Sequence, residues 1–95
     1  MEKIIRDIHY EVIKDYGNTL NDVNLEEIVT NYYDTFDYIV GDWAYGKVRL
    51  KGFYDKGHKF LKSHNDINNV QEYLNEHCAY GCKHFILKKT TVENK

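Results

Sequence analysis

The sequence predicts an α+β fold, a single small domain in which two helices pack on a mainly antiparallel sheet with a central β-hairpin. Stretches that alternate apolar and polar residues predict strands, stretches with apolar residues at helical spacing predict helices, and turn residues separate them. The predicted order is strand, helix, hairpin, helix, strand. A chain of 95 residues suffices for one core, which we expect to be ordered from about residue 5 to residue 90.

The N-terminal half predicts one strand and one helix. Ile8, Tyr10 and Val12 alternate with polar residues, which indicates a strand over residues 8–14, and residues 15–18 then supply a turn. Asn24 resembles the first residue of a capping box and predicts a helix over residues 25–35. The apolar stripe of that helix consists of Leu25, Ile28, Val29, Tyr32 and Phe36.

The central stretch, residues 38–54, predicts a hairpin. With Trp43 opposite Val48 across the loop, a core face would hold Trp43, Gly41, Ile39, Val48, Leu50 and Gly52. The opposite face, which we expect to be exposed, would hold Tyr38, Val40, Asp42, Arg49, Lys51 and Phe53. Glycines inside strands weaken them unless a bulge, a bend or a close backbone approach needs the space.

The C-terminal half predicts a helix and a final strand. Residues 59–65 form a basic connector, and the alternative for residues 59–61 is a short strand. Asp66 is placed to cap a helix over residues 67–78, and Gly81 is placed to end the turn that follows. The last strand covers residues 83–89, and a polar tail begins at about residue 91.

Composition and charge limit the class of protein. Net charge is −2, yet residues 1–45 hold three basic and ten acidic side chains, whereas residues 46–95 hold ten basic and five acidic ones. A pI of 6.2 argues against a dedicated nucleic-acid domain, so we favour the two halves neutralising each other over a basic face for an anionic partner. The absence of a signal peptide and of a long apolar run predicts a cytoplasmic protein with no membrane partner, in which the two cysteines stay reduced.

Two stretches carry a resemblance to a known family. Residues 36–55, which contain Gly41-Asp42-Trp43 and Lys51-Gly52-Phe53, and residues 78–89 resemble the YutD-like family of small Firmicute proteins. The likeness spans about residues 8–89 and departs at Ala44, where the family usually has glycine, and at Lys83-His84, where it is usually uncharged. The resemblance implies a bacterial cytosolic α+β domain, and it brings no established function, catalytic residue or cofactor.

The hairpin predicts a binding surface. Aromatic side chains interleaved with cations can stack on bases and meet phosphates, or can form a protein interface. The predicted surface consists of Tyr38, Asp42, Trp43, Tyr45, Arg49, Lys51, Phe53 and Tyr54, together with the basic last strand. The alternative is structural, with Arg49 paired to Asp42 and a helix covering the face. We expect RNA or a protein as the partner; the sequence gives no oligomeric state.

A second cluster predicts a different chemistry. His77, Cys78, Cys82 and His84 bring two imidazoles and two thiols together, which indicates a thiol, redox or metal site. The spacing is poor for zinc, which favours two distant ligand pairs, and buried free cysteines explain the pattern more simply. We therefore expect no metal and no cofactor. No catalytic motif occurs, so a non-enzymatic binding module is the favoured function and the thiol or metal site is the alternative.

Overall fold

Five antiparallel strands form one sheet in the order β1-β2-β5-β3-β4. The computed structural model describes residues 2–5, 7–44, 46–77 and 82–90. The strands are β1 (Glu2–Ile5), β2 (Ile8–Tyr16), β3 (Tyr38–Ala44), β4 (Lys47–Phe53) and β5 (His84–Lys89). The last strand thus lies at the centre of the sheet, and β4 lies at an edge with β3 as its one neighbour among the described strands.

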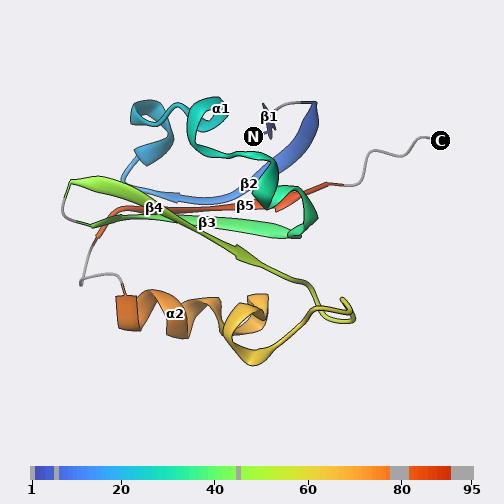
Figure 1. Cartoon of the computed structure of the whole chain (residues 1–95). Coiled ribbons are helices and arrows are strands. Elements are labelled where there is room, and N and C mark those ends of the chain that lie inside the picture. The colour runs from blue at the N-terminus through green and yellow to red at the C-terminus, as the bar shows by residue number, and fades with distance from the viewer. Residues whose placement is uncertain (1, 6, 45, 78–81, 91–95) are drawn as a thin grey trace.

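Helical segments cover both faces of this sheet. Figure 1 shows α1 (Leu25–Ile28) on one side and α2 (Val70–His77) on the other. Shorter 3₁₀ turns flank the two helices, at Thr19–Asp22, Asn31–Thr35, Ser63–Asn65 and Ile67–Asn69. The α+β class and the predicted order of elements are confirmed, with one N-terminal strand added. None of the helices in the described ranges is long and apolar enough to cross a bilayer.

The first helix is much shorter than predicted. It ends at Ile28 because Val29 and Thr30 adopt extended backbone, with ψ angles of 97° and 176°. Two successive β-branched residues have low helix propensity, and the buried Val29 side chain is better placed in the core from an extended backbone. The predicted capping box is also wrong, since the Asn24 side chain makes no cap hydrogen bond.

The second helix follows the prediction more closely. The Asp66 carboxylate accepts a hydrogen bond from the Asn68 N–H (2.9 Å), so its capping role is confirmed. One 3₁₀ turn then precedes the α-helical part, which begins at Val70. A strand at residues 59–61 does not form.

Strand β1 was not predicted. Its residues are mostly charged or exposed, so no alternation over a long run marks it. It pairs with β2 through a tight connection in which Asp7 adopts φ 70°. Ile5 is the one residue of β1 that is fully buried in the core. The alternation of apolar and polar residues that marks a strand is therefore weak here.

The core has two parts, one on each face of the sheet. The larger lies on the α1 side and contains Ile5, Tyr10, Leu20, Leu25, Val29, Ile39, Phe85 and Leu87. The smaller lies on the α2 side and contains Val40, Phe53, Leu74 and Ile86. Central strands with apolar residues in succession need cover on both faces.

The second core corrects the expected orientation of the hairpin. The predicted pairing is confirmed residue by residue, including Asp42 opposite Arg49 and Tyr38 opposite Phe53. The expectation that this face is exposed is wrong for Asp42, Val40 and Phe53, each about 1% exposed. Val40 and Phe53 are buried because they pack with Leu74 of α2. The buried Asp42 carboxylate accepts two hydrogen bonds from Arg49.

Candidate functional site

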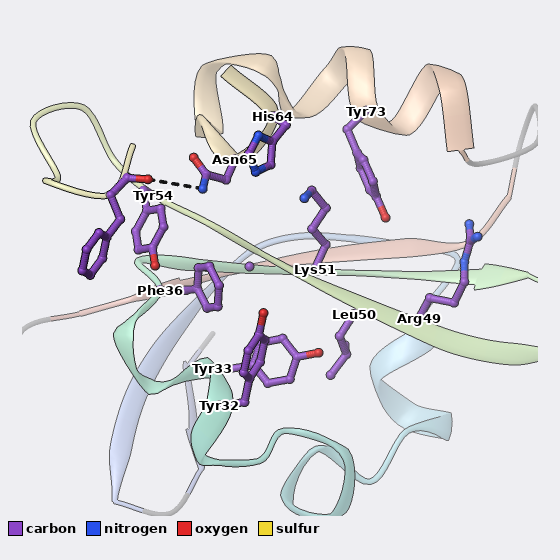
Figure 2. Close-up of a pocket in the computed structure, with 12 residues that line it drawn as sticks. Tyr32, Tyr33, Phe36, Arg49, Leu50, Lys51, Tyr54, His64, Asn65 and Tyr73 are labelled. Atoms are coloured by element: carbon purple, nitrogen blue, oxygen red, sulfur yellow. Dashed lines mark hydrogen bonds between the residues drawn. The ribbon is translucent and has the colours of Figure 1, made fainter. Parts of the chain in front are cut away.

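An open groove of about 540 Å³ runs along the edge strand β4, between the two helical layers (Figure 2). We call it the β4 groove. The strand contributes residues 49–52, and His64 and Asn65 line one end. Half of the lining residues are Tyr or Phe from separate segments, namely Tyr32, Tyr33, Phe36, Tyr54, Phe60 and Tyr73. Figure 2 shows Tyr33 and Phe36 on the α1 side of the strand and Tyr73 on the α2 side.

Every second residue of β4 directs its backbone N–H and C=O groups away from β3. The Trp43 N–H donates to the Lys83 carbonyl (3.1 Å), so the odd-numbered residues of β3 bond towards β5. The even-numbered residues of β3 therefore bond towards β4, where their partners are Lys47, Arg49, Lys51 and Phe53. By this alternation the N–H and C=O groups of Val48, Leu50 and Gly52 point away from β3, towards the free edge.

The next outward residue, Tyr54, is already paired. Its N–H donates to the Asn65 carbonyl (2.7 Å), and its carbonyl accepts from the Ile67 N–H (3.0 Å). These bonds form a parallel bridge between Tyr54 and Asp66. The chain thus occupies one end of the β4 edge with its own backbone and leaves residues 49–52 beside the groove.

Aromatic contacts hold the α1-side wall in place. Phe36 packs directly on Gly52, since a Cβ at that glycine would lie 2.2 Å from the ring. The Phe36 ring lies 4.8 Å from that of Tyr54 and 5.6 Å from that of Tyr32, centroid to centroid. Tyr54 also stacks on His58 at 4.0 Å. The glycine therefore lets a series of rings approach the strand, which answers why a glycine occurs within β4.

Cations line the groove on the α2 side. The Arg49 guanidinium donates to both carboxylate oxygens of Asp42 at 2.9 and 3.2 Å, while 43% of its side chain is exposed. The Lys51 Nζ lies 5.3 Å from the Phe53 ring centroid and 5.8 Å from that of Tyr73. The charged or chargeable lining residues that the structure describes are Arg49, Lys51 and His64, with no carboxylate among them. Arg49 is paired with Asp42, and Glu72 and Glu76 line an adjoining pocket with Lys51 and His64. The lining itself is cationic, and Lys51 is the cation best placed to meet an anionic group.

Two tyrosines in the groove keep their protons at neutral pH. Burial raises the pKa of Tyr73, the negative charge of Asp42 raises it further, and Arg49 partly offsets both. Burial raises the pKa of Tyr33 as well, with a contribution from the neighbouring Tyr32. The protonated Tyr33 hydroxyl can donate a hydrogen bond to an acceptor in the groove.

The structure separates the predicted surface residues into three groups. Arg49, Lys51 and Tyr54 line the groove. Asp42 does not line it, but its carboxylate accepts two hydrogen bonds from Arg49. Phe53 is buried, and Tyr38 and Trp43 are half-buried away from the groove. Tyr45 lies outside the described residues. Leu50 and Gly52, expected on the core face, also line the groove. The other lining residues that sequence reasoning missed come from other segments, namely Tyr32, Tyr33, Phe36, Phe60, His64, Asn65 and Tyr73.

The predicted thiol cluster lies elsewhere in the fold. His84 stacks on Tyr16 at 5.3 Å, and its Nδ1 lies 3.1 Å from the Cys82 carbonyl oxygen. Cys78 and the His77 side chain lie outside the described residues. Within the part of the chain that is described, no three His, Cys, Asp or Glu side chains are grouped so as to hold a metal ion. Cys82 is disulfide-bonded, so the expectation that both cysteines stay reduced is wrong. A redox or metal role for the cluster stays a prediction.

Comparisons with known proteins agree with this fold. The family model described as "Putative antitoxin YutD-like" matches residues 4–88. The chain is 33% identical over 86 residues to "Putative antitoxin YutD" of Bacillus subtilis (strain 168), covering 90% of this chain and 94% of that protein. The solution NMR structure of yutD from B. subtilis superposes with a TM-score of 0.79 at 29% identity, over 100% of this chain and 86% of that one. The chain belongs to the YutD-like family.

Proposed function

We propose that this chain is a non-enzymatic binding module that acts as an antitoxin by holding a segment of a protein partner in the β4 groove. The observation that carries the proposal is an open groove with aromatic walls and a cationic lining beside a sheet edge. An antitoxin neutralises a toxin, and a groove that holds one segment of that toxin is a direct means of doing so. Aromatic residues and Arg are also the side chains that protein interfaces favour.

A protein partner is favoured over RNA by the way the sheet is covered. RNA-binding sheets stack bases on an open sheet face. In this chain α1 lies over one face and α2 over the other, and Val40 and Phe53 are buried (Figure 1). The accessible feature is the strand edge, which is a common docking site for an extended protein segment.

Capture from lysate tests the proposal. The full chain, carrying an affinity tag, is incubated with lysate of its source cells, with and without nuclease and at graded salt. We expect one protein to be retained after nuclease treatment and to be released as salt rises, because the lining is cationic. Retention of nucleic acid alone, or loss of the partner on nuclease treatment, would overturn the protein proposal in favour of RNA.

Matched variants connect that partner to the groove. Lys51→Glu reverses a charge in the lining, and Tyr32→Ser removes a wall residue that is 67% exposed. Each is expected to weaken capture about tenfold or more, and Lys51→Glu should also reduce the salt dependence. The control is Ile13→Thr, a similarly exposed apolar residue on β2 outside the groove. Equal loss of capture in the control would contradict a role for the groove.

A further inference from the structure

We infer that the occupant of the β4 groove is an extended protein segment with acidic side chains at alternate positions, which adds to the sheet as a strand beside β4. This inference rests on the proposed function and specifies its partner. Addition of a strand to a sheet edge gains affinity from backbone hydrogen bonds and specificity from alternate side chains. Both elements of such a site are present in the geometry of β4.

The backbone element is the outward edge at Val48, Leu50 and Gly52. Each of these residues presents one N–H and one C=O away from β3, in the arrangement that an added strand requires. The bridge at Tyr54 and Asp66 shows that this same edge accepts a parallel partner at its next position. An occupant would continue the pairing that the chain itself begins.

The side-chain element follows from the alternation along β4. Lys47, Arg49 and Lys51 share the face towards α2, because successive residues of a strand point to opposite faces. Leu50 and Gly52 share the other face, where Phe36 packs on the glycine. An added strand would therefore place one set of side chains beside the row of cations and the other beside the aromatic wall.

Charge argues against a second copy of this chain as the occupant. Pairing two β4 edges would bring together two rows containing Lys47, Arg49 and Lys51, and like charges across neighbouring strands destabilise the pair. Cations on an edge strand commonly protect against such self-association. The same row attracts a strand whose alternate residues are Asp or Glu, since Lys47 and Lys51 then meet opposite charges.

A designed peptide tests the inference directly. The probe is a synthetic peptide that alternates Glu and Val, and the matched control replaces each Glu with Lys. Hydrogen exchange at the backbone amides of the ¹⁵N-labelled full chain should slow at Val48, Leu50 and Gly52 with the acidic peptide. The amides of Arg49 and Lys51 already bond to β3, so their exchange should change less. Slowing elsewhere but not at the outward amides, or equal binding of the basic peptide, would overturn the inference.

A proline variant isolates the backbone contribution. Leu50→Pro removes an N–H that β3 does not use, and proline is tolerated on edge strands with that orientation. Leu50→Ala loses the same side chain and keeps the N–H, so it is the matched control. We expect Leu50→Pro to bind the acidic peptide about tenfold more weakly than Leu50→Ala. Equal affinities would overturn strand addition; if the proline variant fails to fold, the exchange pattern of the unmodified chain decides.

The inference and the proposed function can fail separately. If Lys51→Glu loses the lysate partner but Leu50→Pro retains it as well as Leu50→Ala does, the groove binds that partner without strand addition. The proposed function then stands and the inference falls. If the unmodified chain captures no protein at all, the proposed function itself falls, and the inference falls with it.

Discussion

Arg49 holds the buried carboxylate of Asp42 with two hydrogen bonds, reaching it from the opposite strand of the hairpin. The carboxylate is about 1% exposed, whereas 43% of the Arg49 side chain is exposed. A buried charge without a partner destabilises the folded state. Arg49, which lines the groove, is therefore also needed for the stability of the fold.

Arg49→Ala should therefore lower the free energy of unfolding by about 2 kcal/mol or more. The reason is that Asp42 stays buried and loses its strongest donor. Urea denaturation measures the effect. The double variant Asp42→Asn with Arg49→Ala is the control and should recover part of the loss, because the buried charge is gone. A stable Arg49→Ala protein would contradict the assigned role, and a destabilised one is a poor probe of binding.

Alkaline pH should destabilise the protein through Tyr73. Burial, assisted by Asp42, raises the pKa of Tyr73 in the folded state above its ordinary value of 10.0. The folded chain then binds this proton more tightly than the unfolded chain, so the stabilisation is present below about pH 10 and is lost as pH rises through the folded pKa. Tyr73→Phe should reduce the difference in unfolding free energy between about pH 8 and about pH 11.

The same tyrosine gives an electrostatic control. Asp42→Asn removes the charge that raises the pKa of Tyr73 and releases Arg49, which lowers it. Ultraviolet titration of the tyrosines, with Tyr73 assigned by difference from Tyr73→Phe, should then show a lower pKa. An unchanged pKa in Asp42→Asn would leave burial as the sole cause.

Two glycines in the hairpin should differ in how well they tolerate a methyl group. A Cβ at Gly41 would lie 2.2 Å from the Phe85 ring, and one at Gly52 would lie 2.2 Å from the Phe36 ring. Phe85 is fully buried and cannot move away, whereas Phe36 is half-buried beside the groove. We expect Gly41→Ala to cost about 3 kcal/mol and Gly52→Ala about 1 kcal/mol, measured by urea denaturation. The reverse order would contradict the described packing.

Leu74 should be the main anchor of α2. Its side chain is 4% exposed and packs in the core on the α2 side, with Val40, Phe53 and Ile86. Leu74→Ala should cost about 2–4 kcal/mol. It should also increase the fluorescence of a hydrophobic dye, because the sheet face beneath is uncovered. Gln71→Ala, an exposed substitution on the same helix, is the control and should be nearly neutral.

Local patterns in the sequence predict part of this fold. The register of the hairpin follows from alternation and a short loop, and Gly46 adopts the positive φ of 78° that such a loop requires. The length of α1 cannot be predicted from the sequence pattern in this way. Val29 fits the apolar stripe of a longer helix by its spacing, yet the backbone of Val29 and Thr30 is extended. Coverage of both sheet faces could have been inferred from Ile39-Val40, where adjacent apolar residues must point to opposite faces.

The groove was harder to predict than the sheet. Arg49, Lys51 and Tyr54 belong to the hairpin and were identified there. Tyr73 and His64 reach the same groove from segments far along the chain, and no local pattern places them opposite β4. The closely spaced rings of Tyr32, Tyr33 and Phe36 were a usable signal, although their spacing was interpreted as part of a core helix.

The most direct test of the central claim is to map the captured partner onto the chain. Backbone amide spectra of the ¹⁵N-labelled protein are compared with and without the purified partner. We predict that the largest shifts lie along Val48–Tyr54 and the facing Tyr32–Phe36 segment, with Lys51→Glu reducing them. Shifts concentrated on β1 and β2, at the opposite edge of the sheet, would contradict the claim that the β4 groove is the binding site.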